Sequence, residues 1–201
     1  MPRQIVAVPL EAAGVRLEPL AEAHREGLRR VAQAPEIWAH MPGPAMGEAF
    51  DPWFNGALAV SAAGPEAAWA VRTLSDGVLV GSTRYLNIEA AHARVEIGHT
   101  WYAPSVWAGV VNPACKFALM RYGFETLGLN RIELKTDIRN TRSQGAIARL
   151  GATREGVFRA HMIRPDGSLR DTVYFSVIRD EWPAVGEGLR ARLAHLSKET
   201  V

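Results

Sequence analysis

The first part of the chain shows two hydrophobic periods in succession. Apolar and polar residues alternate over Gly14–Leu20, which predicts a strand, and Leu28 and Val31 are spaced for one face of a helix over Ala21–Ala32. The next stretch, Ala34–Pro65, has scattered prolines and mixed signals, which are typical of short helices and loops. We expect this stretch to be mobile and to face the substrate.

A meander of three strands is predicted next. The apolar runs Ala68–Leu74 and Val78–Asn87 are separated by Ser75-Asp76-Gly77, and Asp-Gly supplies the positive φ values that a tight hairpin needs. Arg94–Tyr102 is the third candidate strand of the same meander. Three strands joined by short connections are expected to lie side by side.

Helices and strands alternate in the second half. After a loop at about 103–112, a helix closed by Gly128 is predicted, because apolar residues recur at helical spacing at Phe117, Met120, Phe124 and Leu127. Arg131–Asp137 alternates strictly and predicts a strand, and Asn140–Leu150 returns to helical spacing.

Two strands and a polar helix are expected at the end of the chain, at Val157–Arg164, Thr172–Ile178 and Glu181–His195. A meander placed before two strand–helix units favours a mixed sheet with helices on both faces over a doubly wound nucleotide fold. We therefore predict an α/β (α+β) fold with a single domain over residues 1–201, a length that suits one hydrophobic core.

Charge and composition narrow the classes of partner. The formal net charge is only +2, and no basic block is present that could neutralise a row of phosphates, so nucleic acid is not an expected partner. The first residues lack the pattern of a secretion signal, and no stretch approaches the length of a membrane span. A cytoplasmic protein without a membrane partner is expected, and its oligomeric state, a homodimer included, stays open.

Residues that could carry metal or nucleophilic chemistry are sparse. Cys115 is the single cysteine, so an internal disulfide is excluded, and a packed thiol is favoured over a nucleophile. The six histidines never fall at metal-ligand spacing with a carboxylate or thiol, so we expect no metal. The serine-hydrolase elbow and the Walker-type phosphate loop are also missing from the sequence.

Two predicted helices begin in a way that suits anion binding, since the first backbone N–H groups of a helix lack internal partners and carry partial positive charge. One is entered through Val106–Asn112, where small residues would let a phosphate approach and Asn112 is a candidate cap. The other begins at Asn140, with Ser143 at the same end. Taken alone, each opening is more often an ordinary helix cap than a binding site.

Glu96 is a candidate catalytic base. It lies in the third strand of the meander beside Gly98, and a carboxylate at the centre of a sheet is costly unless it is paired or used. If Glu96 faces a cleft, it can accept a proton from an amine, and if it faces solvent, it is an ordinary surface charge. Glu133 alternates with apolar neighbours and is expected on the exposed side of its strand.

Several passages in a fixed order resemble one enzyme family. They are Glu96-Ile97-Gly98 with Thr100-Trp101, the loop and helix from Trp107 to Glu125, Asn140–Ser143 through Leu150-Gly151-Ala152, and Glu155-Gly156 followed by Asp166-Gly167 and Arg170-Asp171. Their order and spacing resemble the GCN5-related N-acetyltransferases (GNAT), specifically the Rim-type ribosomal-protein N-terminal acetyltransferases. The strand at Val15–Leu20 resembles the opening of the family. The resemblance implies a mixed, mostly antiparallel sheet of about seven strands.

The resemblance also implies a site for acetyl-CoA. The pantetheine arm would lie along the third meander strand at His99, Thr100, Trp101 and Tyr102. The pyrophosphate would meet backbone N–H groups of the following loop and helix start, at Trp107, Ala108, Gly109, Val110, Val111 and Asn112. Asn140 resembles the position that binds the cofactor arm, and Ser143 the position that protonates the departing thiolate.

The function implied by the resemblance is transfer of an acetyl group from acetyl-CoA to a primary amine, on a protein N-terminus or a small molecule, by direct attack in a ternary complex. Glu96, acting through water, would be the base and Ser143 the acid. The phosphate loop holds Trp107, Val110 and Asn112 where the family usually has Arg or Gln, Gly, and Gly or Ala. This difference motivates the alternative of an acyl-CoA-binding or protein-interaction module without transfer activity. A ribosome-surface protein, suggested by the arginine-rich base set, is the third hypothesis.

Overall fold

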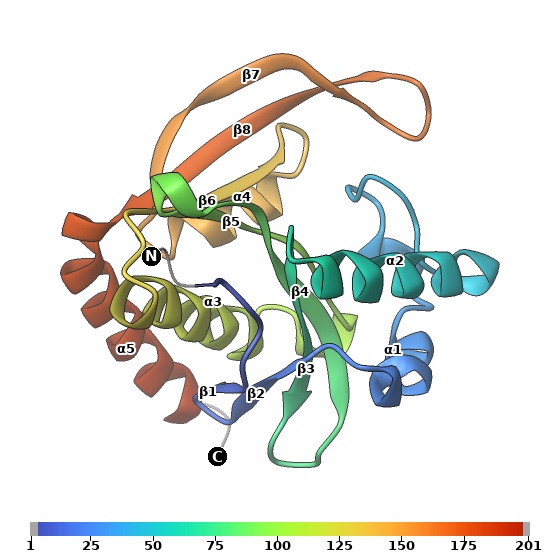
Figure 1. Ribbon diagram of the computed structural model, residues 1–201, viewed down its shortest axis with the longest axis horizontal. Coiled ribbons are helices and arrows are strands. Elements are labelled where there is room, and N and C mark those ends of the chain that lie inside the picture. Colours follow the sequence, from blue (N-terminus) through green and yellow to red (C-terminus); the bar gives the residue numbers. More distant parts are fainter. Residues whose placement is uncertain (1–3, 199–201) are drawn as a thin grey trace.

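One mixed sheet organises the part of the chain that the computed structural model describes, residues 4–198 (Figure 1). Its strand order is β1-β2-β3-β4-β5-β6-β8-β7, and every neighbouring pair is antiparallel except β5 and β6. The strands are β1 (Leu10–Ala12), β2 (Val15–Pro19), β3 (Ala67–Thr73), β4 (Leu79–Glu89), β5 (Arg94–Tyr102), β6 (Arg131–Asp137), β7 (Thr153–Ile163) and β8 (Leu169–Ile178). The predicted mixed, mostly antiparallel sheet is confirmed, with the short β1 as an eighth strand.

Helices cover both faces of this sheet, as predicted (Figure 1). Side chains of α3, α4 and α5 join the larger core on one side, which we call the α5 face. Side chains of α1 and α2 join a second core on the other side, the α2 face. The helices are α1 (Arg25–Val31), α2 (Phe50–Ala63), α3 (Val111–Arg121), α4 (Thr141–Ala148) and α5 (Trp182–Lys198).

Strand alternation determines which side chains of β6 and β8 point to each face. Ile132 and Leu134 are buried in the core of the α5 face, so Glu133, Lys135 and Asp137 point to the α2 face. On β8 the buried residues of the α5 face are Val173, Phe175 and Val177, which directs Arg170, Thr172 and Tyr174 to the α2 face. A row of charged residues therefore lies on one side of the sheet.

The meander is built by the predicted turn. Gly77 has a φ of +69°, and the Asp76 carboxylate accepts hydrogen bonds from the Thr73 hydroxyl at 2.5 Å and the Val78 N–H at 3.1 Å. Near the same turn, Gly81 of β4 faces Tyr102 of β5. A Cβ at Gly81 would lie 2.1 Å from a backbone oxygen of β5, so only glycine fits there.

The two parallel strands separate soon after they meet. Parallel pairing joins residues 94–96 of β5 to residues 131–133 of β6 and then stops. Past Glu96, β5 contains a bulge against β4, and His99 in this bulge has a φ of +44°, a conformation rare for a residue with a side chain. A bulge bends its strand and increases its twist, which turns the end of β5 away from β6.

The stretch between residues 34 and 65 differs from the prediction. Short 3₁₀ turns occur at Pro35–Ile37 and Gly47–Ala49, but α2 is a continuous helix of 14 residues. Pro52 does not interrupt this helix because it lies in the first turn, where its missing N–H has no intrahelical partner to lose. The stretch is anchored to β5 by ring contacts of Trp101 with Trp38 at 5.4 Å and Trp53 at 5.6 Å.

Smaller differences concern the ends of elements. The predicted strand at Val157–Arg164 begins earlier, at Thr153, and the strand predicted at Thr172 begins at Leu169. Together β7 and β8 form a long two-stranded arm that extends past the other strands (Figure 1). The helix predicted to close at Gly128 ends in a π-helical turn at Tyr122–Thr126, and Gly128 has the expected left-handed φ of +70°.

Candidate functional site

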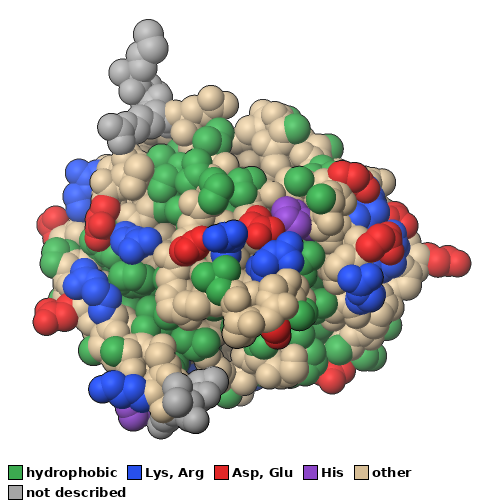
Figure 2. Space-filling model, turned by 90° about the horizontal axis from the view of Figure 1, so that it is seen from below, with side chains coloured by type: hydrophobic (Ala, Val, Ile, Leu, Met, Phe, Trp, Pro, Cys, Tyr) green, Lys and Arg blue, Asp and Glu red, His purple; other side chains and the backbone are tan. Residues whose placement is uncertain are grey.

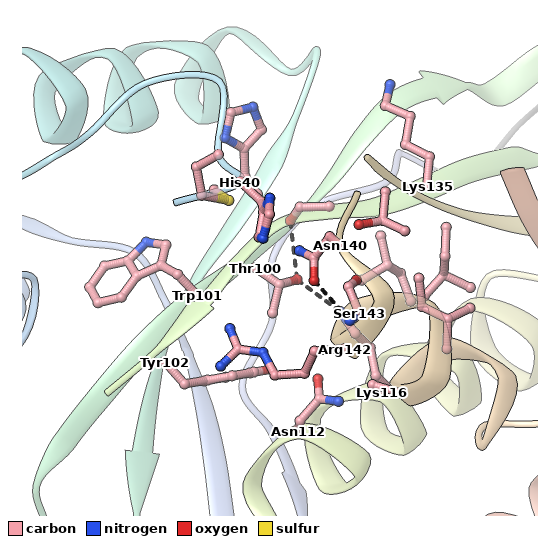
Figure 3. A pocket seen from close by; sticks show the side chains of 18 of the residues that line it. His40, Thr100, Trp101, Tyr102, Asn112, Lys116, Lys135, Asn140, Arg142 and Ser143 are labelled. Carbon is pink, nitrogen blue, oxygen red and sulfur yellow. Dashed lines mark hydrogen bonds between the residues drawn. The ribbon is translucent and has the colours of Figure 1, made fainter. Parts of the chain in front are cut away.

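A cleft of about 830 Å³ opens where β5 and β6 separate. Its walls come from both strands, from the beginnings of α3 and α4, from residues 36–42 and from single residues of β7, β8 and α5. Its lining residues come from both sides of the sheet, from α3, α4 and α5 on the α5 face and from residues 36–42 on the α2 face, and we call the two ends of the cleft its mouths on these faces. Figure 3 shows side chains of these different elements around the same space.

The end of β5 forms one wall. Ile97–Tyr102 lie beyond the last parallel pair with β6, so their backbone groups on that side have no strand partner in the described sheet. All of His99, Thr100, Trp101 and Tyr102 line the cleft, and their role in binding a cofactor stays a prediction. Burial lowers the pKa of His99, which keeps this imidazole neutral near pH 7.

Glu96 is a cleft residue, and the surface-charge interpretation is wrong. Only 2% of the residue is exposed, and its carboxylate lies 2.9 Å from the Lys135 ammonium and accepts a hydrogen bond of 2.8 Å from the Asn87 amide. Gly98 leaves room for it, since a Cβ there would lie 2.8 Å from a Glu96 carboxylate oxygen. Glu133, expected to be exposed, is half-buried and paired with Arg94 and Arg131.

Asn140 caps α4, as predicted. Its side-chain oxygen accepts a hydrogen bond of 2.9 Å from the backbone N–H of Ser143 (Figure 3). Both residues also line the cleft, at the side opposite β5. The structure therefore brings Asn140 and Ser143 together with Glu96 and residues 99–102 around one space.

Three of the six residues predicted to meet the pyrophosphate line the cleft. The cleft is lined by Trp107, Ala108 and Asn112, whereas Gly109, Val110 and Val111 are not among its walls, and Val111 is buried in the core. Asn112 is not the cap, because α3 begins one residue earlier, at Val111. The chain turns at Ala108, which has a φ of +62°, so the strained position is this alanine and not Gly109.

Lys116 is a cleft residue that sequence reasoning missed. It is 5% exposed, its ammonium donates a hydrogen bond of 2.8 Å to the Thr100 hydroxyl, and that hydroxyl is 2.7 Å from the Thr83 hydroxyl. Burial lowers the pKa of Lys116 to about 8. Its position was readable from spacing, since Lys116 follows Asn112 by four residues and so lies on the same helix face.

Three arginines at the mouth on the α5 face were also missed. Arg142 lies over the ring of Trp107, with its guanidinium carbon 3.8 Å from the ring centroid. Arg149 follows Arg142 by two turns and lies on the same side of α4. Arg192 of α5 donates a hydrogen bond of 3.1 Å to the backbone carbonyl of Arg149. All three line the cleft and give this mouth a positive charge. Their grouping depends on how α4 and α5 pack, which no local pattern records.

The comparisons with known proteins agree with this arrangement. Residues 15–153 match the acetyltransferase (GNAT) domain family. The chain belongs to the GNAT family. A GCN5-related N-acetyltransferase from Brucella melitensis has the same fold, with a TM-score of 0.88 and 29% identity over 95% of this chain and 87% of that one.

Two further proteins are similar to this GNAT chain. The chain is 33% identical over 110 residues, 54% of its length, to the "Putative ribosomal N-acetyltransferase YdaF" of Bacillus subtilis (strain 168), a match that covers 58% of that protein. Mycobacterium smegmatis RimJ in complex with CoA-disulfide shares the fold, with a TM-score of 0.77 and 23% identity over 92% of this chain and 93% of that one. The chain spans 57–62% of the lengths of the curated relatives that it matches.

Cys115, the one cysteine considered as a nucleophile, is not part of the cleft of this GNAT protein. Cys115 is fully buried in the core, and burial raises the pKa of its thiol to about 11, as for a packed, unreactive cysteine. Within residues 4–198, no group of His, Cys, Asp and Glu side chains could hold a metal ion, and no helix is long and apolar enough to cross a bilayer. On the face in Figure 2, basic and acidic side chains are interspersed.

Proposed function

We propose that this protein transfers the acetyl group of acetyl-CoA to a primary amine. The observation that carries the proposal is the separation of β5 from β6 beyond Glu96, which opens a passage between the two faces of the sheet. A long thioester can lie in this passage from the mouth on the α5 face, while an amine reaches it from the other mouth. Membership of the GNAT family supports the same assignment.

The residues present suit the cofactor. The unpaired backbone groups of residues 97–102 offer the hydrogen bonds that an amide-rich pantetheine arm needs. The phosphates would lie near the N-terminal turn of α3, whose free N–H groups favour negative charge. Arg142, Arg149 and Arg192 add three cations at this mouth. These arginines compensate for a loop that has Trp107, Val110 and Asn112 in place of the usual family residues.

The chemistry assigned to the protein is proton transfer and positioning. Glu96, through a water molecule, takes a proton from the amine as the amine nitrogen attacks the thioester carbon. Backbone N–H groups at the end of β5 stabilise the negative oxygen that develops there. The carbon–sulfur bond then breaks, and Ser143 gives a proton to the departing thiolate. The products are the acetylated amine and free coenzyme A, with no covalent intermediate on the protein.

A second candidate function is an acyl-CoA-binding module without transfer activity. The observation that favours it is the ion pair between Glu96 and Lys135, which engages the carboxylate of the proposed base. The phosphate loop, which lacks the usual family residues, also favours a module without transfer activity. In this case acetyl-CoA binds, but no amine yields free thiol.

The test combines binding and turnover. Because acetyl-CoA binds only the folded state, we expect it to raise the melting temperature, with a stabilisation of about 2.7 kcal/mol at 100 times its Kd. Adenine nucleotides without the pantetheine arm should stabilise less. Release of coenzyme A thiol is then measured with a panel of amines that includes peptide N-termini. Melting curves unchanged at millimolar acetyl-CoA would contradict both functions, and binding without thiol release from any amine would support the second.

A further inference from the structure

The mouth on the α2 face contains a buried cation without a matching anion. Arg170 of β8 lines the cleft and is only 8% exposed. Its Nε is buried and has no hydrogen-bond partner within the described residues. Burial lowers the pKa of Arg170, yet a guanidinium remains charged in proteins. Such a group is costly to bury unless something negative binds it.

Asp137, the neighbouring acid, is not a hydrogen-bond partner of Arg170. Arg170 Nε lies 4.0 Å from the nearest oxygen of Asp137, which is beyond hydrogen-bonding distance. Both oxygens of Asp137 are already occupied, because Arg164 donates to them at 2.6 Å and 2.9 Å and the Arg139 N–H donates at 2.9 Å. Asp137 balances the charge of Arg164, so Arg170 is left as one surplus positive charge.

The nearest charges across the cleft are also balanced. Glu96 and Lys135, which point to the same α2 face, form their own ion pair at 2.9 Å. Arg170 is therefore a buried cation without a hydrogen-bonded anion in the described part of the chain, close to the proposed base. The other walls near this mouth include Ile37, Met41 and Met162, together with Glu36 and His40 of the segment 36–42.

We propose that Arg170 binds a carboxylate carried by the amine acceptor, so that the acceptors of this protein are acidic amines. The proposal rests on the proposed function, which places the acceptor at this mouth and the cofactor phosphates at the other. A planar guanidinium matches a carboxylate with two parallel hydrogen bonds. One surplus charge fits a carboxylate better than a phosphate monoester, which carries nearly two negative charges. An anion bound here is held beside Glu96, where the amine must lose its proton.

The carboxylate has two possible sources, an α-carboxylate of a free amino acid or the side chain of the second residue of a peptide. Matched acceptors distinguish them: an amino acid against its amide, and an Ala-Asp peptide against an Ala-Asn peptide. The measured quantity is kcat/KM for thiol release. In one of the two pairs, we expect kcat/KM to be about tenfold or more higher for the acidic acceptor. This ratio corresponds to the free energy of one charge-assisted hydrogen bond.

Arg170→Gln should reduce that preference to near unity while acetyl-CoA affinity stays unchanged. Arg159→Gln is the matched control, because Arg159 is an exposed arginine of the same arm and does not line the cleft. The control should keep the full preference. A purely structural Arg170 would lower the rates for acidic and neutral acceptors alike, and that result would overturn the proposal, as would equal wild-type rates within both pairs.

A binding measurement covers the case in which no amine is acetylated. N-acetylated Ala-Asp and Ala-Asn peptides are titrated calorimetrically into the wild-type protein saturated with coenzyme A, and the amino-acid pair is treated in the same way. Tighter binding of an acidic product, lost in Arg170→Gln, would support the anionic site even if transfer fails. If the acidic and neutral compounds bind alike, or if neither binds, the proposed carboxylate site at Arg170 is wrong. The proposed acetyl transfer is judged separately, because thiol release from neutral amines would still support it.

Discussion

The two mouths of the cleft differ in the groups that supply their charge. At the α5 face, backbone N–H groups, the starts of α3 and α4 and the arginines 142, 149 and 192 offer positive charge to a ligand. At the α2 face, Glu96, Lys135 and Arg170 are held by ion pairs and burial within the sheet. The first mouth suits a large anion. The second combines buried charges, to which we assign the selection of the acceptor.

This difference predicts how each mouth responds to substitution. A ligand held by many backbone groups and exposed cations loses only part of its affinity when one side chain is removed. A buried charge has few partners, and its loss changes protonation, selectivity or stability sharply. The substitutions below test this comparison, from the largest expected effect to the smallest.

The largest effect is expected for Glu96→Gln, which keeps the shape of the side chain and removes the basic oxygen. If Glu96 is the base, turnover should fall by about 10²–10⁴-fold with little change in acetyl-CoA affinity. Glu133→Gln is the matched control, since Glu133 faces Glu96 in the register of β6 and does not line the cleft. Thiol release with a known acceptor measures both. Retention of more than about a third of wild-type turnover would show that Glu96 is not the base.

Lys116→Met should stabilise the fold, because the buried ammonium is a cost. The pKa of Lys116 falls from 10.5 in the unfolded chain to about 8 in the folded protein. Below pH 8 both states bind the proton and the cost, about 3 kcal/mol, is fully present, and it disappears as the pH rises from 8 to 10.5. Subtracting about 1 kcal/mol for the lost Thr100 hydrogen bond leaves a gain of about 2 kcal/mol at pH 7.

Urea unfolding at several pH values measures this gain, which should shrink steadily above pH 8. Lys198→Met is the control, because Lys198 is exposed at the end of α5 and its loss should change the free energy of unfolding by at most about 0.5 kcal/mol. A Lys116→Met protein that is less stable than the wild type at pH 7 would mean that the ammonium is compensated by contacts other than Thr100.

A smaller effect is expected for Asn140→Ala at the cofactor mouth. Loss of the cap should lower the free energy of unfolding by about 1 kcal/mol, and loss of the amide should raise the KM for acetyl-CoA. Asn140→Ser separates the two roles, because serine retains a capping oxygen but not the amide. It should fold as the wild type does and still show the raised KM. An unchanged KM in both variants would leave the cap as the sole role of Asn140.

The sequence was most informative where structure is local. The Asp76-Gly77 turn, the left-handed Gly128 and the Asn140 cap depend on a few adjacent residues, and each was predicted. The start of α3 was misplaced because the chain turns at Ala108, a conformation that alanine rarely adopts. The continuous α2 was missed because Pro52 was counted as a breaker, although it lies in the first turn.

The least predictable residues were those brought together by register and packing. Glu96 was a candidate from its position in a strand, but its partner Lys135 depends on the parallel pairing of β5 with β6. Arg170 appeared in the sequence only as part of a family-like passage. Its surplus charge follows from the hydrogen bonds that Arg164 makes to Asp137, and no spacing rule indicates which of two nearby arginines an acid will choose.

The tryptophan contacts on β5 give the protein an optical reporter of its own. Trp101 lines the cleft, and its indole packs against Trp38, within the segment 36–42, and against Trp53 of α2. Indole emission responds to its surroundings, and these three are half of the six tryptophans in the chain. A ligand that shifts residues 36–42 against β5 therefore changes a signal already present, so the order in which the two substrates bind can be followed by stopped-flow fluorescence without a label.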